Sequence, residues 1–203
     1  MIPRWRLPQG APGQRIGLYG GTFNPPHAAH RLVADIALRR LGLDRVWWLV
    51  TPGNPLKDQD GLPSVAERMA LTQAVARGPR HHVSGLETDI GARFTCETVA
   101  WLQRRFPHMH FVLVIGADSF VTLHRWRRWR DIMRRVPVAV IDRPGSTLAA
   151  AASVAARSFA AARVPEPAAR ALALRRPPAW TLLHGPRSGL SSTAIRAGRR
   201  TPP

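Results

Sequence analysis

The sequence has one cysteine, one lysine, few acids and no long apolar run. Because Cys96 has no second cysteine to pair with, a disulfide is excluded and a reducing compartment is favoured over a secreted one. The densest apolar runs, Val46–Val50 and Phe111–Ile115, are far shorter than the roughly 18 residues of a membrane-spanning helix. The first fifteen residues contain no apolar signal-peptide region. We therefore expect a soluble, cytoplasmic protein with no membrane segment.

The scarcity of acid leaves the chain strongly basic, with 30 arginines and lysines against 12 acids and a formal net charge of +18. This balance excludes an acidic-surface binder and raises the hypothesis of a nucleic-acid partner. The charge is unevenly distributed, however. Residues 16–120 contain eleven cations against nine acids, whereas residues 121–203 contain sixteen arginines against three acids. Since Lys57 is the only lysine, the arginine excess resembles a coding preference more than a set of selected contacts.

Apolar strands and amphipathic helices alternate along the chain. Short apolar runs that end at glycine or proline predict strands at residues 15–19, 45–51, 81–84, 110–115, 136–141 and 180–183. Helical spacing predicts helices at 28–41, 64–77, 95–106 and 191–198, a helical stretch ending at 135, and one or two helices in 148–176 with a break at 165–167. Strands that are apolar throughout favour a parallel sheet buried on both faces. We predict the α/β class, with a Rossmann-like doubly wound parallel sheet and helices on both faces.

Composition also indicates the domain organisation. Residues 1–14 are rich in proline, glycine and arginine and show no periodicity, so we predict a mobile N-terminal tail. Residues 15–200 are expected to form a single domain. Within it, residues 146–178 are rich in alanine and arginine, and we expect this segment to be helical but can assign it no role.

The strongest local signal follows the first predicted strand, between Gly20 and His30. Gly20 and Gly21 allow the backbone to approach a ligand, and Asn24 is a candidate cap for the following helix. His27 and His30 are three residues apart on the first turn, so they face the same side of that helix. Two imidazoles beside a helix N-terminus form a candidate anion site. Taken alone, such a pair is more often a capped turn with surface histidines, and a metal site lacks a third ligand.

A second helix start lies near the other end of the chain. Ser191, Ser192 and Thr193 offer hydroxyls and free backbone N–H groups at the start of a predicted helix, and Arg196 follows one turn later. A guanidinium in that position could bind phosphate oxygens. The serines alone are only a good cap, but two candidate phosphate-binding helix starts in one α/β chain favour a phosphate-bearing substrate.

Both runs resemble motifs of one enzyme superfamily. The run Gly20-Gly21-Thr22-Phe23-Asn24-Pro25-x-His27-x-x-His30 resembles the nucleotidyltransferase signature, GGTFDPxHxGH in many members, with Asn24 for Asp and Ala29 for Gly. Ser191 to Arg196 resembles the ISSTxIR element. The intervening elements are similar, in order, to those of the bacterial nicotinate-nucleotide adenylyltransferases, with Leu56 and Phe94 where many members have His and Tyr. They are Asn54-Pro55-Leu56-Lys57, Glu67-Arg68-Met69, Phe94-Thr95-Cys96-Glu97-Thr98, Ile115-Gly116-Ala117-Asp118, Leu123 to Trp126, and Arg143-Pro144-Gly145.

The resemblance implies transfer of the adenylyl group of ATP to nicotinate mononucleotide in NAD biosynthesis, giving nicotinate adenine dinucleotide and pyrophosphate. It implies Mg²⁺ accompanying ATP, no metal ligands from the protein and no specific nucleic-acid partner. The implied catalytic residues are His27, His30, Lys57 and Arg196. The implied ATP and phosphate contacts are Gly20, Gly21, Thr22, Phe23, Gly116, Asp118, Ser191, Ser192 and Thr193. The implied nicotinate-nucleotide contacts are Thr95, Trp126 and Arg143.

Two other functions stay open on the sequence alone. A different transferase of the same superfamily would act on phosphopantetheine, on nicotinamide or flavin mononucleotide, or with a cytidylyl donor. A basic nucleic-acid-binding domain would use Trp126 and Trp129, with their flanking arginines, for base stacking and charge. Thr95 and Asp118 also have structural interpretations, as a helix start and a helix cap.

Overall fold

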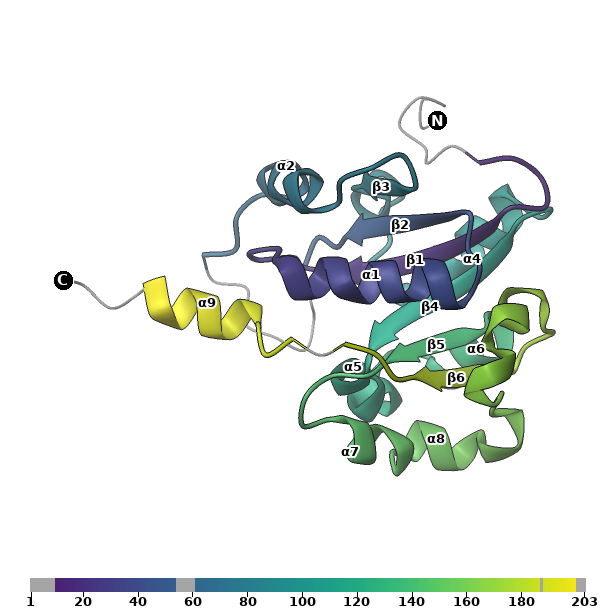
Figure 1. Cartoon of the computed structure of the whole chain (residues 1–203). Coiled ribbons are helices and arrows are strands. Elements are labelled where there is room, and N and C mark those ends of the chain that lie inside the picture. Colours follow the sequence, from purple (N-terminus) through teal and green to yellow (C-terminus); the bar gives the residue numbers. More distant parts are fainter. Residues whose placement is uncertain (1–9, 54–60, 187, 200–203) are drawn as a thin grey trace.

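The computed structural model of the chain describes residues 10–53, 61–186 and 188–199. In this part, six parallel strands form one sheet in the order β3-β2-β1-β4-β5-β6 (Figure 1). They are β1 Arg15–Gly21, β2 Arg45–Val50, β3 His81–Ser84, β4 His110–Gly116, β5 Val138–Ile141 and β6 Trp180–Leu183. The strand order changes direction between β1 and β4, as in Rossmann-type sheets. The predicted doubly wound α/β fold is confirmed.

Helices cover both faces of the sheet, as predicted (Figure 1). One face carries α1 (Ala28–Arg40), α2 (Val65–Val75) and the 3-10 helix η4 (Glu166–Leu174). The other carries α3 (Leu86–Asp89), α4 (Thr95–Arg105), α5 (Ala117–Thr122), α6 (Trp129–Arg135), α7 (Thr147–Ala151) and α8 (Val154–Ser158). Successive residues of β2 point to opposite faces of the sheet, so that Trp47 belongs to one core and Trp48 to the other. This two-sided burial is why the strands are apolar throughout.

Three stretches differ from the sequence-based expectation. The sequence does not predict α3, because a four-residue helix is too short to show a periodic pattern. The helical stretch before residue 135 is interrupted between η2 (Leu123–Arg125) and α6, where Arg128 adopts a left-handed conformation (φ 52°). Residues 148–176 form α7, α8, η3 (Ala160–Ala162) and η4 rather than one or two helices. Ser153 accepts a hydrogen bond from Ala156 N (3.2 Å), which starts a new helix inside the alanine-rich run.

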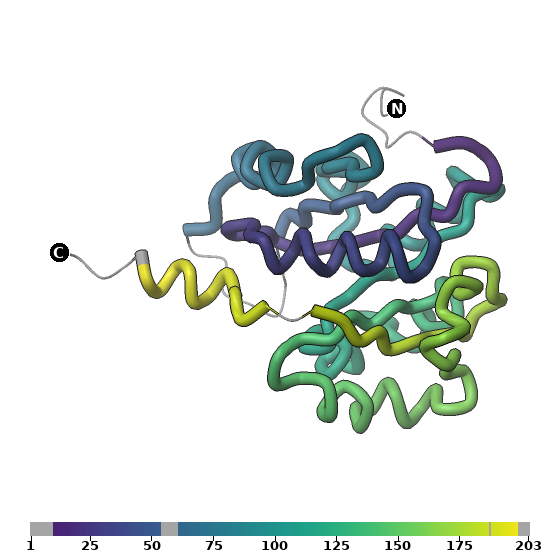
Figure 2. The backbone as a smooth tube through the Cα atoms, viewed as in Figure 1, coloured from purple at the N-terminus to yellow at the C-terminus, as the bar shows by residue number. Residues whose placement is uncertain are grey.

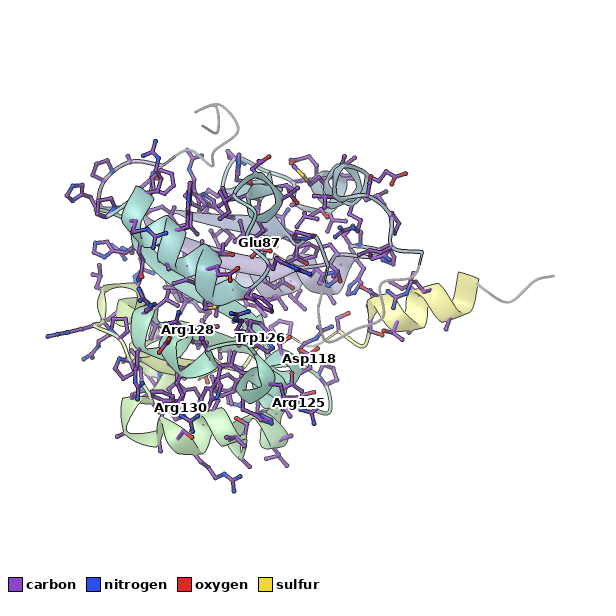
Figure 3. The ribbon with its side chains drawn as sticks, turned by 180° about the vertical axis from the view of Figure 1, so that it is seen from behind. Glu87, Asp118, Arg125, Trp126, Arg128 and Arg130 are labelled. Carbon is purple, nitrogen blue, oxygen red and sulfur yellow. The ribbon has the colours of Figure 1, made fainter. Side chains whose placement is uncertain are left out.

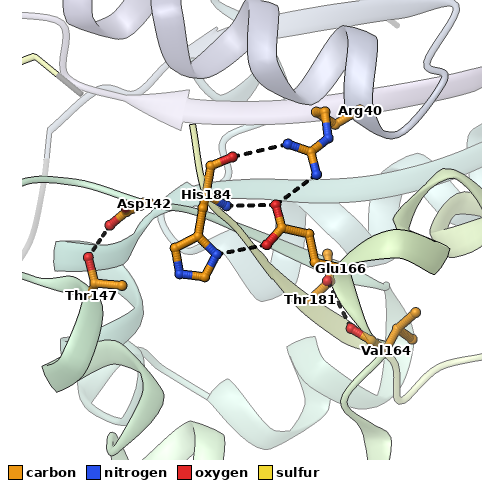
Figure 4. Close-up of polar contacts among 7 residues, drawn as sticks. All are labelled: Arg40, Asp142, Thr147, Val164, Glu166, Thr181 and His184. Atoms are coloured by element: carbon orange, nitrogen blue, oxygen red, sulfur yellow. Dashed lines mark hydrogen bonds and ion pairs between the residues drawn. The ribbon is translucent and has the colours of Figure 1, made fainter. Parts of the chain in front are cut away.

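Polar contacts fix this alanine-rich segment to the rest of the domain (Figure 4). Glu166 Oε1 accepts hydrogen bonds from Arg40 Nη2 (2.7 Å) and from the backbone N–H of His184 (3.0 Å). The second carboxylate oxygen lies 2.7 Å from His184 Nδ1. These contacts join the end of α1, the start of η4 and the residue that follows β6. They therefore set the direction in which the chain leaves the sheet toward its last helix.

Only residues 10–14 of the predicted N-terminal tail belong to the described part. They are mostly exposed, and Gly13 N donates a hydrogen bond to His108 O (2.7 Å) just before β1 begins. The tail and the limits of the single domain therefore stay predictions. None of the described helices is long and apolar enough to span a membrane.

Arg68 connects the loops that follow β1 and β2. Its side chain is 1% exposed, and the guanidinium Nη1 donates to Thr22 O (2.9 Å) and Thr51 O (2.8 Å). Nη2 donates to Pro52 O (3.2 Å), and Nε donates to Pro63 O (2.8 Å). One side chain of α2 thus satisfies four backbone carbonyls from three segments. A buried charge whose donors are satisfied in this way is costly to remove, because each carbonyl left unpaired in the interior costs about 1–3 kcal/mol.

We expect Arg68→Met to lower the free energy of unfolding by about 3–5 kcal/mol, since it leaves these carbonyls without donors. Chemical denaturation followed by circular dichroism measures this loss. The control is Arg77→Met, which removes an exposed arginine at the end of the same helix and should change stability by less than about 0.5 kcal/mol. Equal effects of the two substitutions would contradict the role given to Arg68.

Candidate active site

A cavity of about 950 Å³ opens at the carboxyl ends of the central strands. Its walls include Gly20 and Gly21 of β1, Thr51 after β2 and Gly116 of β4. Ligands of open α/β sheets bind beyond the carboxyl ends of the strands, where the strand order changes direction. The volume is at the upper end of the range found for small-molecule sites. This cavity is therefore the candidate active site.

The cavity gathers every predicted site residue that belongs to the described part of the chain. The residues predicted from the first motif are Gly20, Gly21, Thr22, Phe23, His27 and His30, and those from the second are Ser191, Ser192, Thr193 and Arg196. The remaining ones are Thr95, Gly116, Asp118, Trp126 and Arg143. Lys57, the other predicted catalytic residue, lies outside the described residues. The cavity brings the two motifs together, but the role of each residue in it stays a proposal.

The glycine-rich turn after β1 rests on an aromatic cluster. Phe23 is 2% exposed, and its ring packs edge-on against Tyr19 (centroids 5.5 Å apart) and His30 (5.1 Å). Phe23 adopts a left-handed backbone conformation (φ 46°), which is unfavourable for a bulky residue and requires support from its surroundings. A Cβ on Gly21 would lie only 3.0 Å from the ring of Phe23, whereas a Cβ on Gly20 would meet open space. The turn is thus packed on one side and open to the cavity on the other.

The prediction that Asn24 caps α1 is wrong. The cap position is His27, and α1 begins at Ala28. Asn24 instead accepts a hydrogen bond through its backbone oxygen from the guanidinium of Arg196. Asparagine is a favoured cap on average, but Asn24 lies four residues before Ala28, the first residue of α1, and so precedes the cap position.

His27 and His30 stack on each other with their ring centroids 3.8 Å apart, as their predicted common face implies. The backbone N–H of His27 donates to His30 Nδ1 (3.2 Å), so in the neutral ring the proton of His30 is on Nε2. Burial, then the neighbouring His27, then Arg143 lower the pKa of His30 to about 3. Burial and Arg143 also lower the pKa of His27. Both imidazoles are therefore neutral hydrogen-bond donors at neutral pH.

His27 also has unsatisfied polar atoms. The residue is 7% exposed, and neither ring nitrogen has a hydrogen-bond partner. An unpaired buried donor costs about 1–3 kcal/mol, and such groups are rare away from functional sites. Because His27 lines the cavity, a ligand oxygen placed there would supply the missing partner.

The second motif reaches the first through α9 (Ser192–Arg199). Ser192 Oγ donates to Pro25 O (2.9 Å), while Arg196 bonds to the backbone of the preceding residue, Asn24. Figure 2 shows the same arrangement, with the yellow C-terminal helix beside the purple turn after the first strand. These contacts place Ser191, Ser192 and Thr193 at the edge of the cavity.

Asp118, which follows β4, forms an ion pair with Arg143, which follows β5. Asp118 Oδ2 lies 3.5 Å from Arg143 Nη1, and Arg143 Nη2 donates to Leu190 O (3.3 Å). A Cβ on Gly116 would lie 2.5 Å from Asp118 Oδ1 and 2.9 Å from Arg143 Cδ, so a larger residue here would force these side chains to move. The carboxylate is half exposed to the cavity (52%), where it can accept hydrogen bonds from hydroxyl groups.

A further part of the wall comes from α3, α4 and η2 (Figure 3). Thr95 begins α4, Trp126 follows η2, and the guanidinium of Arg127 lies 4.8 Å from the centroid of the Phe94 ring. This combination of an indole and a helix N-terminus suits an aromatic ring that carries a negative group.

Sequence reasoning gave no role to two residues of this region. Arg68 enters only as part of a family pattern, and no local signal shows that it binds two loops. Glu87 on α3 lines the cavity, is 7% exposed and accepts a hydrogen bond from Thr98 Oγ1 (2.8 Å). Burial raises the pKa of Glu87 to about 7, although the bond from Thr98 opposes this. A single acid after a short strand carries no recognisable pattern, so only the structure identifies it.

We expect His30 to stay neutral between about pH 5 and pH 8, because its pKa lies near 3. The ring signals of His30 in heteronuclear NMR spectra, assigned by comparison with His30→Asn, should not move over this range. A titration midpoint between pH 5 and pH 8 would contradict the burial and the hydrogen bond described above.

Comparison with known proteins agrees with the predicted family and the fold. Residues 18–198 match the cytidylyltransferase-like family. A probable nicotinate-nucleotide adenylyltransferase of Methylorubrum extorquens is 60% identical over 182 residues, which are 90% of this chain and 98% of that protein. One of Rhizobium johnstonii is 53% identical over 192 residues, covering 95% of this chain and 96% of that protein.

A solved structure shares the fold at low sequence identity. It is the nicotinic acid mononucleotide adenylyltransferase of Plasmodium falciparum in complex with NaAD, with a TM-score of 0.67 and 16% identity over 91% of this chain and 83% of that one. The structural likeness concerns the fold, whereas the bacterial relatives show the family. The chain belongs to the nicotinate-nucleotide adenylyltransferase family, within the cytidylyltransferase-like proteins.

Proposed function

We propose that this chain transfers the adenylyl group of ATP to the phosphate of nicotinate mononucleotide, which yields nicotinate adenine dinucleotide and pyrophosphate for NAD biosynthesis. One observation carries the proposal beyond family membership. The two candidate phosphate-binding helix starts, which come from opposite ends of the chain, are joined by hydrogen bonds beside one cavity. A cytoplasmic location stays a prediction from the sequence.

The reaction needs no nucleophile from the protein, because the phosphate of the mononucleotide is itself the attacking group. One of its oxygens attacks the α-phosphorus of ATP in line, and the bond from that phosphorus to the bridging oxygen of the β-phosphate breaks. Pyrophosphate leaves with both electrons of that bond, and no enzyme-bound intermediate forms. The obstacle is repulsion between two anions, and positioned hydrogen-bond donors and cations reduce it.

His27 and His30 are proposed to donate hydrogen bonds to the phosphates of ATP as neutral rings. A neutral imidazole keeps its Nε2 proton over the working pH range, so this contact does not depend on protonation. The unsatisfied nitrogens of buried His27 support the assignment. The N-terminus of α1 adds a favourable dipole at the same place. Preorganised donors of this kind each typically contribute a factor of about 10²–10³ to the rate.

Arg196 and Ser192 are proposed to hold the other side of the triphosphate. The guanidinium of Arg196 is anchored to Asn24 O and lines the cavity, so its remaining donors are already oriented when the nucleotide arrives. Lys57, predicted from the sequence to assist the leaving pyrophosphate, is retained in this role as a proposal. Gly20, Gly21, Thr22 and Phe23 would allow close approach of the nucleotide.

The remaining predicted residues are proposed to contact either a ribose or the pyridine ring. Asp118 is proposed to accept hydrogen bonds from ribose hydroxyls, and Arg143 holds it in place through their ion pair. Trp126 would stack on the pyridine ring, and backbone N–H groups at Thr95 would meet the ring carboxylate. The guanidinium of Arg127, which lies over the ring of Phe94, adds positive charge at this end of the cavity.

Mg²⁺ is proposed to arrive with ATP as part of the substrate, coordinated by the phosphate oxygens. Bound there, it would neutralise charge on the leaving pyrophosphate. Among the described residues there is no group of three or more His, Cys, Asp or Glu side chains that could hold a metal ion.

We expect His27→Ala and His30→Ala each to lower kcat by at least about 100-fold, because each removes a donor to the phosphates. Stability should change much less than activity, so the unfolding transition stays cooperative. The control is His108→Ala, an exposed histidine before β4, which should retain wild-type turnover. Wild-type kcat in both active-site variants would exclude the proposed contacts.

The substrate is tested by measuring pyrophosphate release from ATP and Mg²⁺ with nicotinate mononucleotide, nicotinamide mononucleotide or phosphopantetheine. We expect the highest kcat/KM with nicotinate mononucleotide. Preference for phosphopantetheine would indicate another transferase of the superfamily. Release with none of the three, together with salt-dependent binding of random oligonucleotides, would instead favour the nucleic-acid hypothesis.

A further inference from the structure

Glu87 is an acid in a cavity proposed to bind anions. It lies on α3, is 7% exposed and lines the cavity together with Thr95 and Trp126. Figure 3 labels Glu87 and Trp126. A buried carboxylate is costly unless it is paired, and here it would also repel a negatively charged substrate. Such a group therefore requires an explanation beyond packing.

The surroundings of Glu87 connect it to the start of α4. Its Oε1 accepts a hydrogen bond of 2.8 Å from Thr98, which is 1% exposed and lies one turn after Phe94. This contact uses one carboxyl oxygen as an acceptor and leaves the other free to carry a proton. The N-terminus of α4 is where the negative group of the pyridine ring is proposed to bind. Glu87 thus approaches the same end of the nucleotide.

No described cation forms an ion pair with Glu87. The strand that packs against α3 contributes apolar residues, Trp47 and Leu49, to the core that Leu86 joins. The charged residues near Glu87 in sequence are Asp89 on its own helix, Arg93 in the following loop and Glu97 on α4. The other charged or titratable residues along the cavity are Tyr19, His27, His30, Asp118, Arg125, Arg127, Arg143 and Arg196. Burial, opposed only by the bond from Thr98, accounts for the raised pKa of Glu87, near 7.

We infer that Glu87 is a specificity-determining residue that presents its carboxyl group to the substituent on the pyridine ring of the nucleotide. This inference rests on the proposed function. The protonated carboxyl donates a hydrogen bond to a ring carboxylate, which favours the acid form of the nucleotide. The ionised carboxylate repels a ring carboxylate and accepts a hydrogen bond from a carboxamide. The protonation state of the buried Glu87 carboxyl group therefore controls the preference for the acid over the amide nucleotide.

The sign of the pH dependence follows. Below the pKa of Glu87 the neutral form strengthens the preference for nicotinate mononucleotide, and above it the ionised form shifts the ratio toward nicotinamide mononucleotide. The measured quantity is the ratio of kcat/KM for the two nucleotides between about pH 5.5 and pH 8.5. Titrations that both reactions share, such as those of phosphate groups, cancel in this ratio. We expect the ratio to fall by about tenfold with a midpoint near pH 7, corresponding to one hydrogen bond to a charged group.

Three variants separate this role from a structural one. Glu87→Gln keeps an acceptor for Thr98 but cannot ionise, so its ratio should not depend on pH. Thr98→Val removes the donor that stabilises the ionised form, so the midpoint should move to higher pH. Glu97→Gln removes an exposed acid next to Thr98 on α4. This variant should keep the pH dependence of the wild-type ratio.

The pH dependence of the kcat/KM ratio in the wild-type protein tests the inference without any variant. A ratio independent of pH in the wild type overturns the inference, and so does an unchanged midpoint in Glu87→Gln. Failure to release pyrophosphate with either nucleotide overturns the proposed function and the inference that rests on it. Turnover of both nucleotides at a constant ratio overturns the inference alone.

Discussion

Arg68 donates hydrogen bonds from one buried guanidinium to backbone carbonyls of the loop after β1, the loop after β2 and the turn before its own helix. Arginine can do this because its donors are fixed in a plane and point outward, whereas lysine presents a compact point charge. The turn that carries His27 and His30 begins at one of these loops. The geometry of the proposed phosphate site therefore depends on a side chain that does not line the cavity.

The first motif, which is proposed to bind the triphosphate, carries little formal charge of its own. Burial keeps His27 and His30 neutral, and Arg143, which lowers their pKa values further, is itself paired with Asp118. Oriented neutral donors do not attract counterions and need no reorganisation when charge develops on the phosphates. Most of the net charge of +18 lies elsewhere in the chain, so the overall basicity says little about the chemistry.

The sheet could be predicted from the sequence because strand burial on both faces leaves continuous apolar runs, as in Val46–Val50. The two motifs could be predicted because each is a local pattern at a helix start. Arg68 and Glu87 could not, since their roles depend on carbonyls and hydroxyls that come near only after folding. The cap assigned to Asn24 is wrong because α1 begins later, with His27 at the cap position. The contact of Asn24 O with Arg196 could not be predicted either, because the two residues are 172 positions apart.

The long sequence separation of the contacts at α9 has a consequence for how stability and activity relate. The last helix is largely exposed, and the side-chain hydrogen bonds that join it to the first motif span 167 and 172 residues. Helices held by few buried contacts open locally at a lower free energy than the core. Because neither hydrophobic core includes a described residue of α9, we expect the core and the sheet to stay intact if this helix detaches, while the proposed phosphate site loses one of its two helix starts. A melting temperature therefore measures the stability of the sheet. Hydrogen exchange of the backbone amides of Ser192–Arg199 measures instead whether α9 is docked beside the cavity.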